Sequence, residues 1–232
     1  MFLRVVAALG LAAALLTPMS ASSQEPAHFT YSPSPPGTIV QSQLLYLTGQ
    51  AMHSQWRGVV SRKLLGTSGT TQFYQYYLSL YSINENVYQL RYQSPKNGGP
   101  MDVVKKVDSS MWFPMQALSV VGVGQFQIPT VENLVVTSHQ TGADCGGAQI
   151  TIFGYDTTKN KVVEEAVITN GCDLNARVVQ SANGLASLQL TGPYYNATAA
   201  MCCPTENKAT ATLRYVNNKW VESPNYFKLV TH

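Results

Sequence analysis

Alternation of side-chain character is the feature that most constrains the fold of this chain. Between residues 74 and 81, Tyr or Leu at every even position alternates with Gln, Ser or Tyr at the odd ones. The alternation resumes in Tyr88, Leu90 and Tyr92, after the turn residues Asn84-Glu85-Asn86. A period of two residues is typical of a β-strand with one buried face, since successive side chains point to opposite faces. This segment therefore predicts a β-hairpin.

The turn sets which residues share a face of this hairpin. If Ile83 faces Val87, then Leu80 faces Leu90, and one face is apolar while the other carries a polar and aromatic set. Tyrosine combines rigid contact area with a polar tip, so this second face is a candidate surface for a sugar or a partner protein. The alternative is that a second sheet packs over it, as in a sandwich. The candidate binding residues are Tyr77, Tyr81, Gln89 and Arg91.

Two further hairpins are predicted by their turns. One runs from Ala148 to Tyr155 and returns from Lys161 to Ile168, and the other joins Thr210–Val216 to Lys219–Glu222 through Asn217-Asn218. Two consecutive Asn residues suit the left-handed backbone of a type I′ turn, which would place Tyr215 opposite Trp220. Short strands with few helix signals predict a mainly β domain, an antiparallel sandwich or barrel-like fold. Other strand candidates are Leu118–Val123, Asn133–Ser138, Arg177–Ser181 and Ala186–Thr191.

The one candidate helix lies between Thr38 and Leu65. There, Ile39, Leu44, Leu47 and Met52 would share one face of a helix, although Gly49 interrupts the pattern and clear capping residues are absent.

The first 23 residues have the parts of a secretory signal peptide. Arg4 precedes an apolar run from Val5 to Leu16, and small residues follow at Ser20–Ser23. The run is shorter than the roughly 20 residues that cross a bilayer, and no later segment is a candidate span. Residues 24–37, rich in Pro and Ser, are expected to form an extended tether. We therefore expect a secreted or periplasmic protein with a single β-rich domain over residues 38–232.

Low charge excludes two classes of function. Only 12% of residues are charged and the net charge is +3, against about 25% charged residues in a typical globular protein. A nucleic-acid binder would show a concentrated basic patch, and a disordered chain would show high charge with few aromatic residues. With 13 Tyr, 7 Phe and 3 Trp, the chain matches neither class.

The four cysteines predict a disulfide framework, because an even count in an exported chain favours oxidised pairs. In the second predicted hairpin, residues whose numbers sum to about 317 lie opposite each other, and Cys145 and Cys172 fit that sum at its open end. This favours a Cys145–Cys172 bond, which leaves Cys202 and Cys203 as a vicinal pair. In the crossed alternative, Cys202 and Cys203 bond separately to Cys145 and Cys172.

Catalytic and metal-binding patterns are sparse. His139 and Asp144 lie close together in a loop before Cys145, where a nucleophile–base arrangement is conceivable, but a loop-building role fits them better. Glu164 and Glu165 are adjacent on a predicted strand, so their carboxylates should point to opposite faces. The scattered His residues and the Cys spacing do not fit a zinc site. The pattern favours no catalytic residue, no metal and no cofactor.

The C-terminal part of the chain resembles a known family. Met201-Cys202-Cys203-Pro204-Thr205, followed by Arg214-Tyr215 and Trp220, is similar to the C-terminal region of the LppP/LprE family of bacterial exported lipoproteins. That resemblance implies a β-rich protein of the bacterial envelope and transfers no catalytic residue. This chain departs from the family in lacking a Cys directly after its predicted signal, which is where a lipid would be attached. The stretch Val121–Phe153 also resembles FG-GAP-like strand pairs, but without their acidic calcium loop.

Together these patterns predict an exported, disulfide-stapled, non-enzymatic binding or envelope-associated module, whose ligand is a protein or a glycan. Two alternatives remain. One is an extracellular hydrolase that uses the His139/Asp144 loop. The other is a structural surface component that assembles through an exposed sheet edge.

Overall fold

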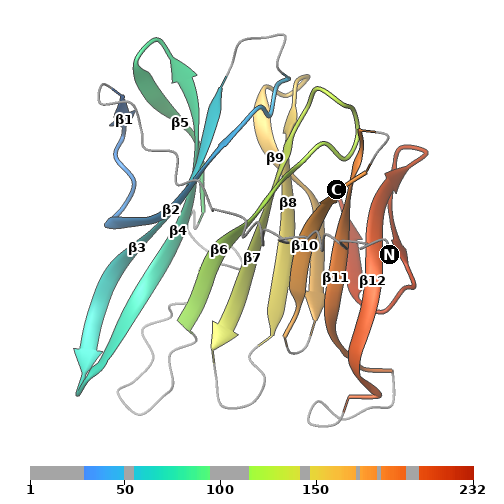
Figure 1. Ribbon diagram of the computed structural model, residues 1–232. Coiled ribbons are helices and arrows are strands. Elements are labelled where there is room, and N and C mark those ends of the chain that lie inside the picture. Colours follow the sequence, from blue (N-terminus) through green and yellow to red (C-terminus); the bar gives the residue numbers. More distant parts are fainter. Residues whose placement is uncertain are drawn as a thin grey trace, which may run out of the picture.

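The computed structural model of the 232-residue chain describes residues 29–49, 55–94, 115–141, 147–170, 173–181, 184–196 and 204–232. These residues form strands joined by turns and loops (Figure 1), and no helix among them has the length and apolarity that crossing a membrane requires. The strands are β1 Thr30–Ser32, β2 Thr38–Leu45, β3 Trp56–Ser68, β4 Thr71–Asn84, β5 Val87–Ser94, β6 Met115–Gly124, β7 Asn133–Thr141, β8 Ala148–Asp156, β9 Lys161–Asn170, β10 Asn175–Gln180, β11 Ala186–Tyr194, β12 Glu206–Val216, β13 Lys219–Ser223 and β14 Lys228–Thr231.

The strands form three sheets, each built around four consecutive antiparallel strands. The first sheet has the order β1-β5-β4-β3-β2, the second β14-β9-β8-β7-β6, and the third β10-β11-β12-β13. β1 joins the first sheet parallel to β5, and β14 joins the second antiparallel to β9. The predicted antiparallel, all-β sandwich is therefore confirmed.

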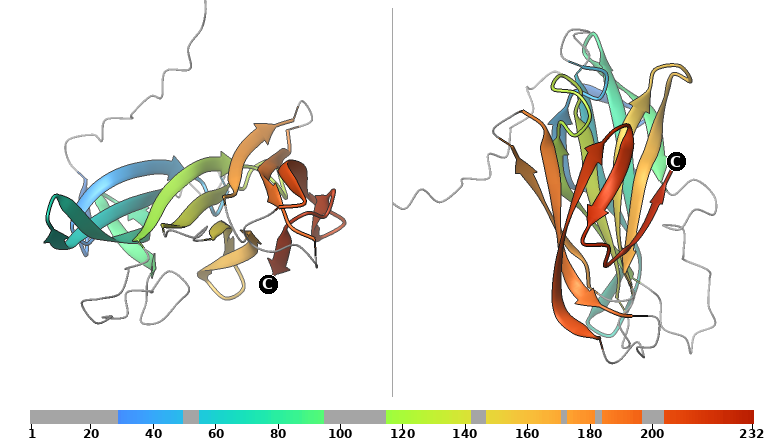
Figure 2. Two further views of the ribbon diagram at one scale, coloured as in Figure 1. Left: turned by 90° about the horizontal axis from the view of Figure 1, so that it is seen from below. Right: turned by 90° about the vertical axis from the view of Figure 1, so that its right-hand side faces the viewer.

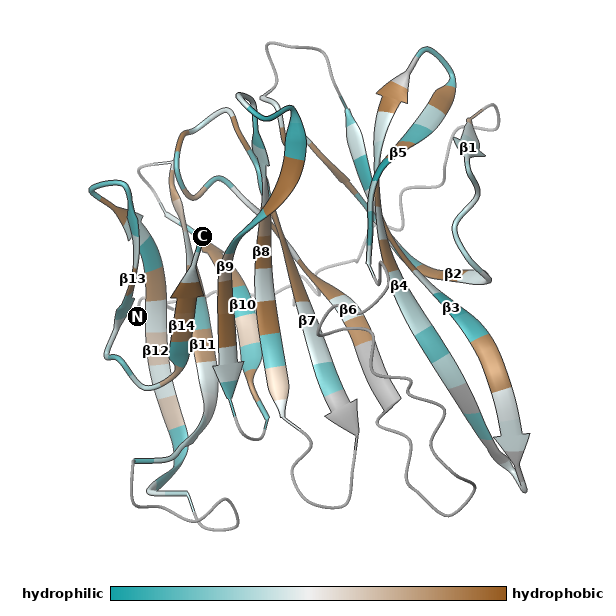
Figure 3. Cartoon of the chain, turned by 180° about the vertical axis from the view of Figure 1, so that it is seen from behind, coloured by the Kyte–Doolittle hydropathy of each residue, from teal (hydrophilic) through white to brown (hydrophobic). Residues whose placement is uncertain are grey.

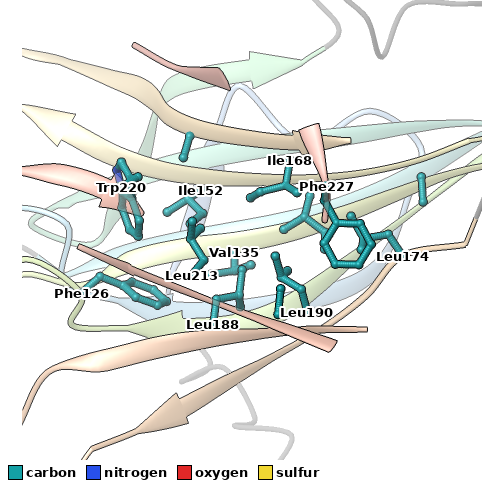
Figure 4. Packing of buried hydrophobic residues seen from close by; sticks show 14 of the residues in the cluster. Phe126, Val135, Ile152, Ile168, Leu174, Leu188, Leu190, Leu213, Trp220 and Phe227 are labelled. Atoms are coloured by element: carbon teal, nitrogen blue, oxygen red, sulfur yellow. The ribbon is translucent and has the colours of Figure 1, made fainter. Parts of the chain in front are cut away.

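The second sheet is the middle layer of a stack of three (Figures 1 and 2). One apolar core fills the space between the first and second sheets and includes Trp56, Leu80 and Phe153. The other lies between the second and third sheets and includes Ile152 and Leu188 (Figure 4). With both of its faces covered, the second sheet buries adjacent apolar residues on opposite faces, such as Val135 and Val136 of β7, and Figure 3 shows hydrophobic bands on β7 and β8 beside hydrophilic ones.

A side-chain amide joins the edges of the first two sheets. Gln41 of β2 donates from Nε2 to the Val120 carbonyl at 3.0 Å, and its Oε1 accepts from the Val120 N–H at 2.8 Å. The amide thereby satisfies both backbone groups of a residue on β6, the edge strand of the second sheet. This contact fixes the position of β2 against β6.

Two of the predicted hairpins have the expected turns, but in the one that starts at Ala148 a bulge between Ile152 and Phe153 shifts the open end by one residue from the predicted register, so Ala148 pairs with Asn170. β8 and β9 pair through Asp156 and Lys161, and β12 and β13 pair across Asn217-Asn218. Both Asn residues have left-handed φ values, 50° and 60°, as the type I′ turn requires. Tyr215 faces Trp220, with ring centroids 5.3 Å apart.

The register predicted for the β4–β5 hairpin is wrong. Its turn has two residues, with Glu85 at a φ of 54°, so Tyr81 and not Leu80 pairs with Leu90. Farther along, Leu80 pairs with Tyr92, so Arg91 is the extra residue of a β-bulge. A bulge reverses the alternation, which explains why Leu90 and Tyr92 contact different cores.

The helix predicted within residues 38–65 is also wrong, since β2 and β3 occupy this segment. Val59 and Val60 contact cores on opposite faces of the first sheet, as adjacent strand residues do. The helical spacing of Ile39, Leu44 and Leu47 is therefore coincidental, and Met52 lies outside the described residues.

Part of the predicted tether belongs to the folded body. Phe29 and Tyr31 pack on Tyr88, with ring centroids 5.2 and 4.9 Å from it, and β1 pairs with β5. The packed chain therefore begins at Phe29 at the latest.

All four cysteines lie outside the described residues, so their pairing stays a prediction. The strand ends nearest the first two, Ala148 of β8 and Asn170 of β9, are strand partners.

Candidate functional site

The first predicted surface, on the β4–β5 hairpin, does not exist in the expected form. Tyr81 is fully buried. Its ring lies 4.8 Å from that of Tyr31, and its hydroxyl donates to the Pro33 carbonyl at 3.1 Å. The prediction of Tyr81 as an exposed binding residue is therefore wrong. The N-terminal segment covers it, in place of the second sheet considered as the alternative.

The other members of that group divide between two environments. Arg91 is exposed and donates to the Ser82 hydroxyl at 2.8 Å and to the Gln89 amide oxygen at 3.4 Å. Tyr77 is half-buried, opposite Ser61 of β3. Gln89 and Arg91 are therefore in contact with each other, whereas Tyr81 is buried.

The second predicted site is described only in part. His139 lies on β7 between Ala117 and Ala148, with its Nε2 3.1 Å from the Thr137 hydroxyl oxygen. Asp144 lies outside the described residues. Within the described ranges, no group of three or more His, Cys, Asp or Glu side chains could hold a metal ion.

The adjacent carboxylates Glu164 and Glu165 have partners in different directions. The Tyr92 hydroxyl, from the first sheet, donates to Glu164 at 3.1 Å, whereas the Gln127 amide donates to Glu165. Glu165 is the extra residue of a bulge, because Ile152 pairs with Ala166 and Phe153 with Glu164. Sequence reasoning did not foresee this bulge or the environment that it creates.

Glu165 is a mostly buried carboxyl whose position depends on a glycine. A Cβ at Gly154 would overlap its Oε1, so only glycine leaves room for the carboxyl there. Burial raises the pKa of Glu165 to about 7, and the neighbouring Asn133 amide opposes only part of that rise. The Asn133 amide is itself fully buried, and apart from this contact with Glu165 neither of its polar atoms has a hydrogen-bond partner within the described residues. Glu165 is thus a mostly buried group that titrates near neutral pH, but Glu165 and Asn133 are not a pair of catalytic groups.

The third sheet has one polar surface, on the side that faces away from the core. One side of each of its strands packs into the core with Leu188, Ala211 and Trp220, and the opposite side faces away from the second sheet. We call this opposite side the outer face, and none of its side chains is buried. Its members are Asn175, Arg177, Val179, Ser187, Gln189, Thr191, Thr210, Thr212, Arg214, Val216, Lys219, Val221 and Ser223.

The register of the four strands aligns polar side chains of the outer face in a row. Arg177 pairs with Gln189, Gln189 with Thr212, and Thr212 with Ser223, so one row of polar side chains crosses all four strands. Three of these thirteen residues (Arg177, Arg214 and Lys219) are cations and none is a carboxylate, while the exposed Glu206 and Lys208 lie at the end of β12 beyond the bulge that shifts its register with β11. The acidic residue of β13, Glu222, points the other way, and its Oε1 accepts from the Tyr226 and Phe227 N–H groups at 2.9 and 3.0 Å. The outer face is therefore basic and rich in hydroxyl and amide groups.

The sequence predicts the four strands of the third sheet, but it does not predict the polar row on their outer face. Alternation in β11 and β12 predicts which side chains leave the core, but the row appears only once the register of four strands is known. Comparisons of the chain with family models, with curated proteins and with solved structures give no match. The resemblance to LppP/LprE lipoproteins therefore stays a prediction.

Proposed function

We propose that the chain is an exported binding module without catalytic function, and that the outer face of the third sheet binds an anionic glycan. The observation that carries the proposal is the polar row from Arg177 to Ser223 on a face that has cations and no carboxylate. The predicted signal peptide supports a location outside the cytoplasm, where such polymers are found.

The chemistry of the outer face suits a uronic acid polymer. An Arg guanidinium presents a planar fork of N–H donors that matches a carboxylate, and Arg177 and Arg214 supply two of these. Thr, Ser and Gln side chains both donate and accept, as sugar hydroxyls do. Strands are spaced about 4.8 Å apart, so the row offers these groups at regular intervals over about 14 Å. A regular ladder of groups along a sheet surface suits a repeating polymer better than a compact molecule, which needs a concave pocket.

The test is retention of the protein on immobilised polygalacturonate and on neutral dextran. We expect retention on the acidic polymer only, weakening as salt is added. Exchanging both arginines for acids (Arg177→Glu with Arg214→Glu) should reduce affinity at least tenfold, because it places like charges against the polymer.

The matched control carries the same change in net charge on the second sheet, Lys161→Glu with Lys228→Glu. Both lysines are exposed, and neither belongs to the outer face. Equal losses in the two variants would show that net charge alone controls retention and would overturn the assignment. Shortening of the polymer by the wild-type protein would overturn the non-enzymatic part of the proposal.

A further inference from the structure

A two-stranded arm extends from the first sheet beyond the neighbouring strands. β2 pairs with β3 only as far as Arg62, and β5 pairs with β4 only from Leu78 onward. Residues 63–75, which we call the β3–β4 arm, pair only with each other among the described strands. Figure 1 shows this hairpin running past β2 at the lower left, and Figure 2 shows it at the outer end of the molecule.

The arm and the adjoining start of β2 gather exposed aliphatic side chains. Leu64 and Leu65 are 48% and 47% exposed, and Ile39 and Val40, next to the strand pair Thr38–Arg62, are 41% and 43% exposed. These are half of the eight large exposed apolar residues of the described chain. Leu64 and Leu65 are adjacent at the projecting arm, and exposed apolar side chains that lie together mark a site of contact with a partner or a membrane.

Cations flank the aliphatic cluster. Lys63 is exposed, and the Arg62 guanidinium lies over the Tyr74 ring, 4.2 Å from its centroid. No Asp or Glu occurs between Glu25 and Glu85 in the sequence. In Figure 3, a hydrophobic band lies beside a hydrophilic one near the end of β3. Apolar side chains bordered by Lys, Arg and Tyr are the combination found where a protein contacts the surface of a bilayer.

We infer that the β3–β4 arm contacts the surface of a membrane with anionic headgroups, inserting Leu64 and Leu65 while Arg62 and Lys63 remain at headgroup level. A second copy of this chain fits the arm less well. A two-fold contact would place the cations of one arm against those of the other, and four side chains supply little of the roughly 800 Å² per partner that a stable dimer buries. This inference concerns a different surface from the one assigned to the glycan, so either can fail alone.

Sedimentation with lipid vesicles tests the inference. The protein is the form without residues 1–23, which keeps every described residue and lacks the apolar leader segment that would itself bind lipid. We expect it to sediment with phosphatidylglycerol-containing vesicles and only weakly with phosphatidylcholine vesicles. The variant Leu64→Gln with Leu65→Gln should bind at least tenfold more weakly, and Lys63→Glu should lower binding to the anionic vesicles alone.

The matched control replaces two equally exposed aliphatic residues elsewhere, Ile128→Gln with Val230→Gln, which are 51% and 40% exposed in the native chain. Circular dichroism and thermal unfolding establish that each variant is folded. Failure of the folded wild-type protein to sediment, or equal binding by the leucine variant and the control, would overturn the inference. A concentration-dependent dimer that the leucine variant abolishes, without vesicle binding, would assign the arm to a second copy instead.

Discussion

Alanine in place of Ile152 and alanine in place of Phe153 should each lower the free energy of unfolding by about 2–5 kcal/mol. The two residues are neighbours on β8 and are both fully buried. In a sheet with one solvated face, one of two adjacent strand residues would be exposed and its truncation would cost little. Here Ile152 packs against the third sheet and Phe153 against the first, where its ring lies 5.3 Å from that of Tyr92. Chemical denaturation of the two single variants measures both costs.

The control for this pair is Gln189→Ala on the outer face, which should change the unfolding free energy by no more than about 0.5 kcal/mol. A large loss for one of the two β8 variants and a change as small as that of the control for the other would contradict the three-layer stack. It would mean that one face of the second sheet is not covered.

The second large effect concerns the buried carboxyl. In the folded protein the pKa of Glu165 is about 7, against an ordinary value of 4.5, so between these pH values the folded state holds more protons than the unfolded one. The free energy of unfolding should therefore fall as pH rises from 4.5 to 7, by at most about 3 kcal/mol from this group. Glu165→Gln should be close to wild type in stability near pH 4.5 and more stable by about 1–3 kcal/mol at pH 8.

The measurement is the difference in unfolding free energy between variant and wild type at several pH values. A difference is needed because burial also raises the pKa of Glu222, which adds a slope of the same sign to both proteins. The exposed Glu206, changed to Gln, is the matched control for the substitution. A Glu165→Gln difference that stays constant from pH 4.5 to 8 would show that the carboxyl is not held in the environment described.

Most strands follow from the sequence, because local chemistry specifies them. The residues Asn217-Asn218 by themselves favour a type I′ turn. In β11 and β12, apolar and polar side chains alternate because only one face of the third sheet packs on the core. No such local pattern predicts the strands within residues 38–65. β2 pairs with β3, β3 pairs with β4, and the Gln41 amide binds Val120 of β6, a residue distant in the sequence. Bulges at Arg91 and Glu165 add single residues that no local pattern marks, and each reverses the faces beyond it.

The functional surfaces depend still more on such distant contacts. Tyr81 reads as exposed because nothing near it in sequence covers it, yet Tyr31 and Pro33 do, about 50 positions away. Arg177 and Gln189 become neighbours of Thr212 only through the register of three strands. The outer face is rich in uncharged polar groups. The position of its few charges is a property of the fold.

Arginine-selective labelling tests the central claim most directly. The protein is treated with a dicarbonyl reagent with and without polygalacturonate, and modification of each arginine is read by peptide mass spectrometry. Arg91 is the internal control, since it is exposed on the surface first predicted from sequence and lies on the first sheet. We predict that the polymer protects Arg177 and Arg214 at least fivefold and leaves Arg91 unchanged. Protection of Arg91 with continued modification of Arg177 and Arg214 would contradict the assignment of the outer face.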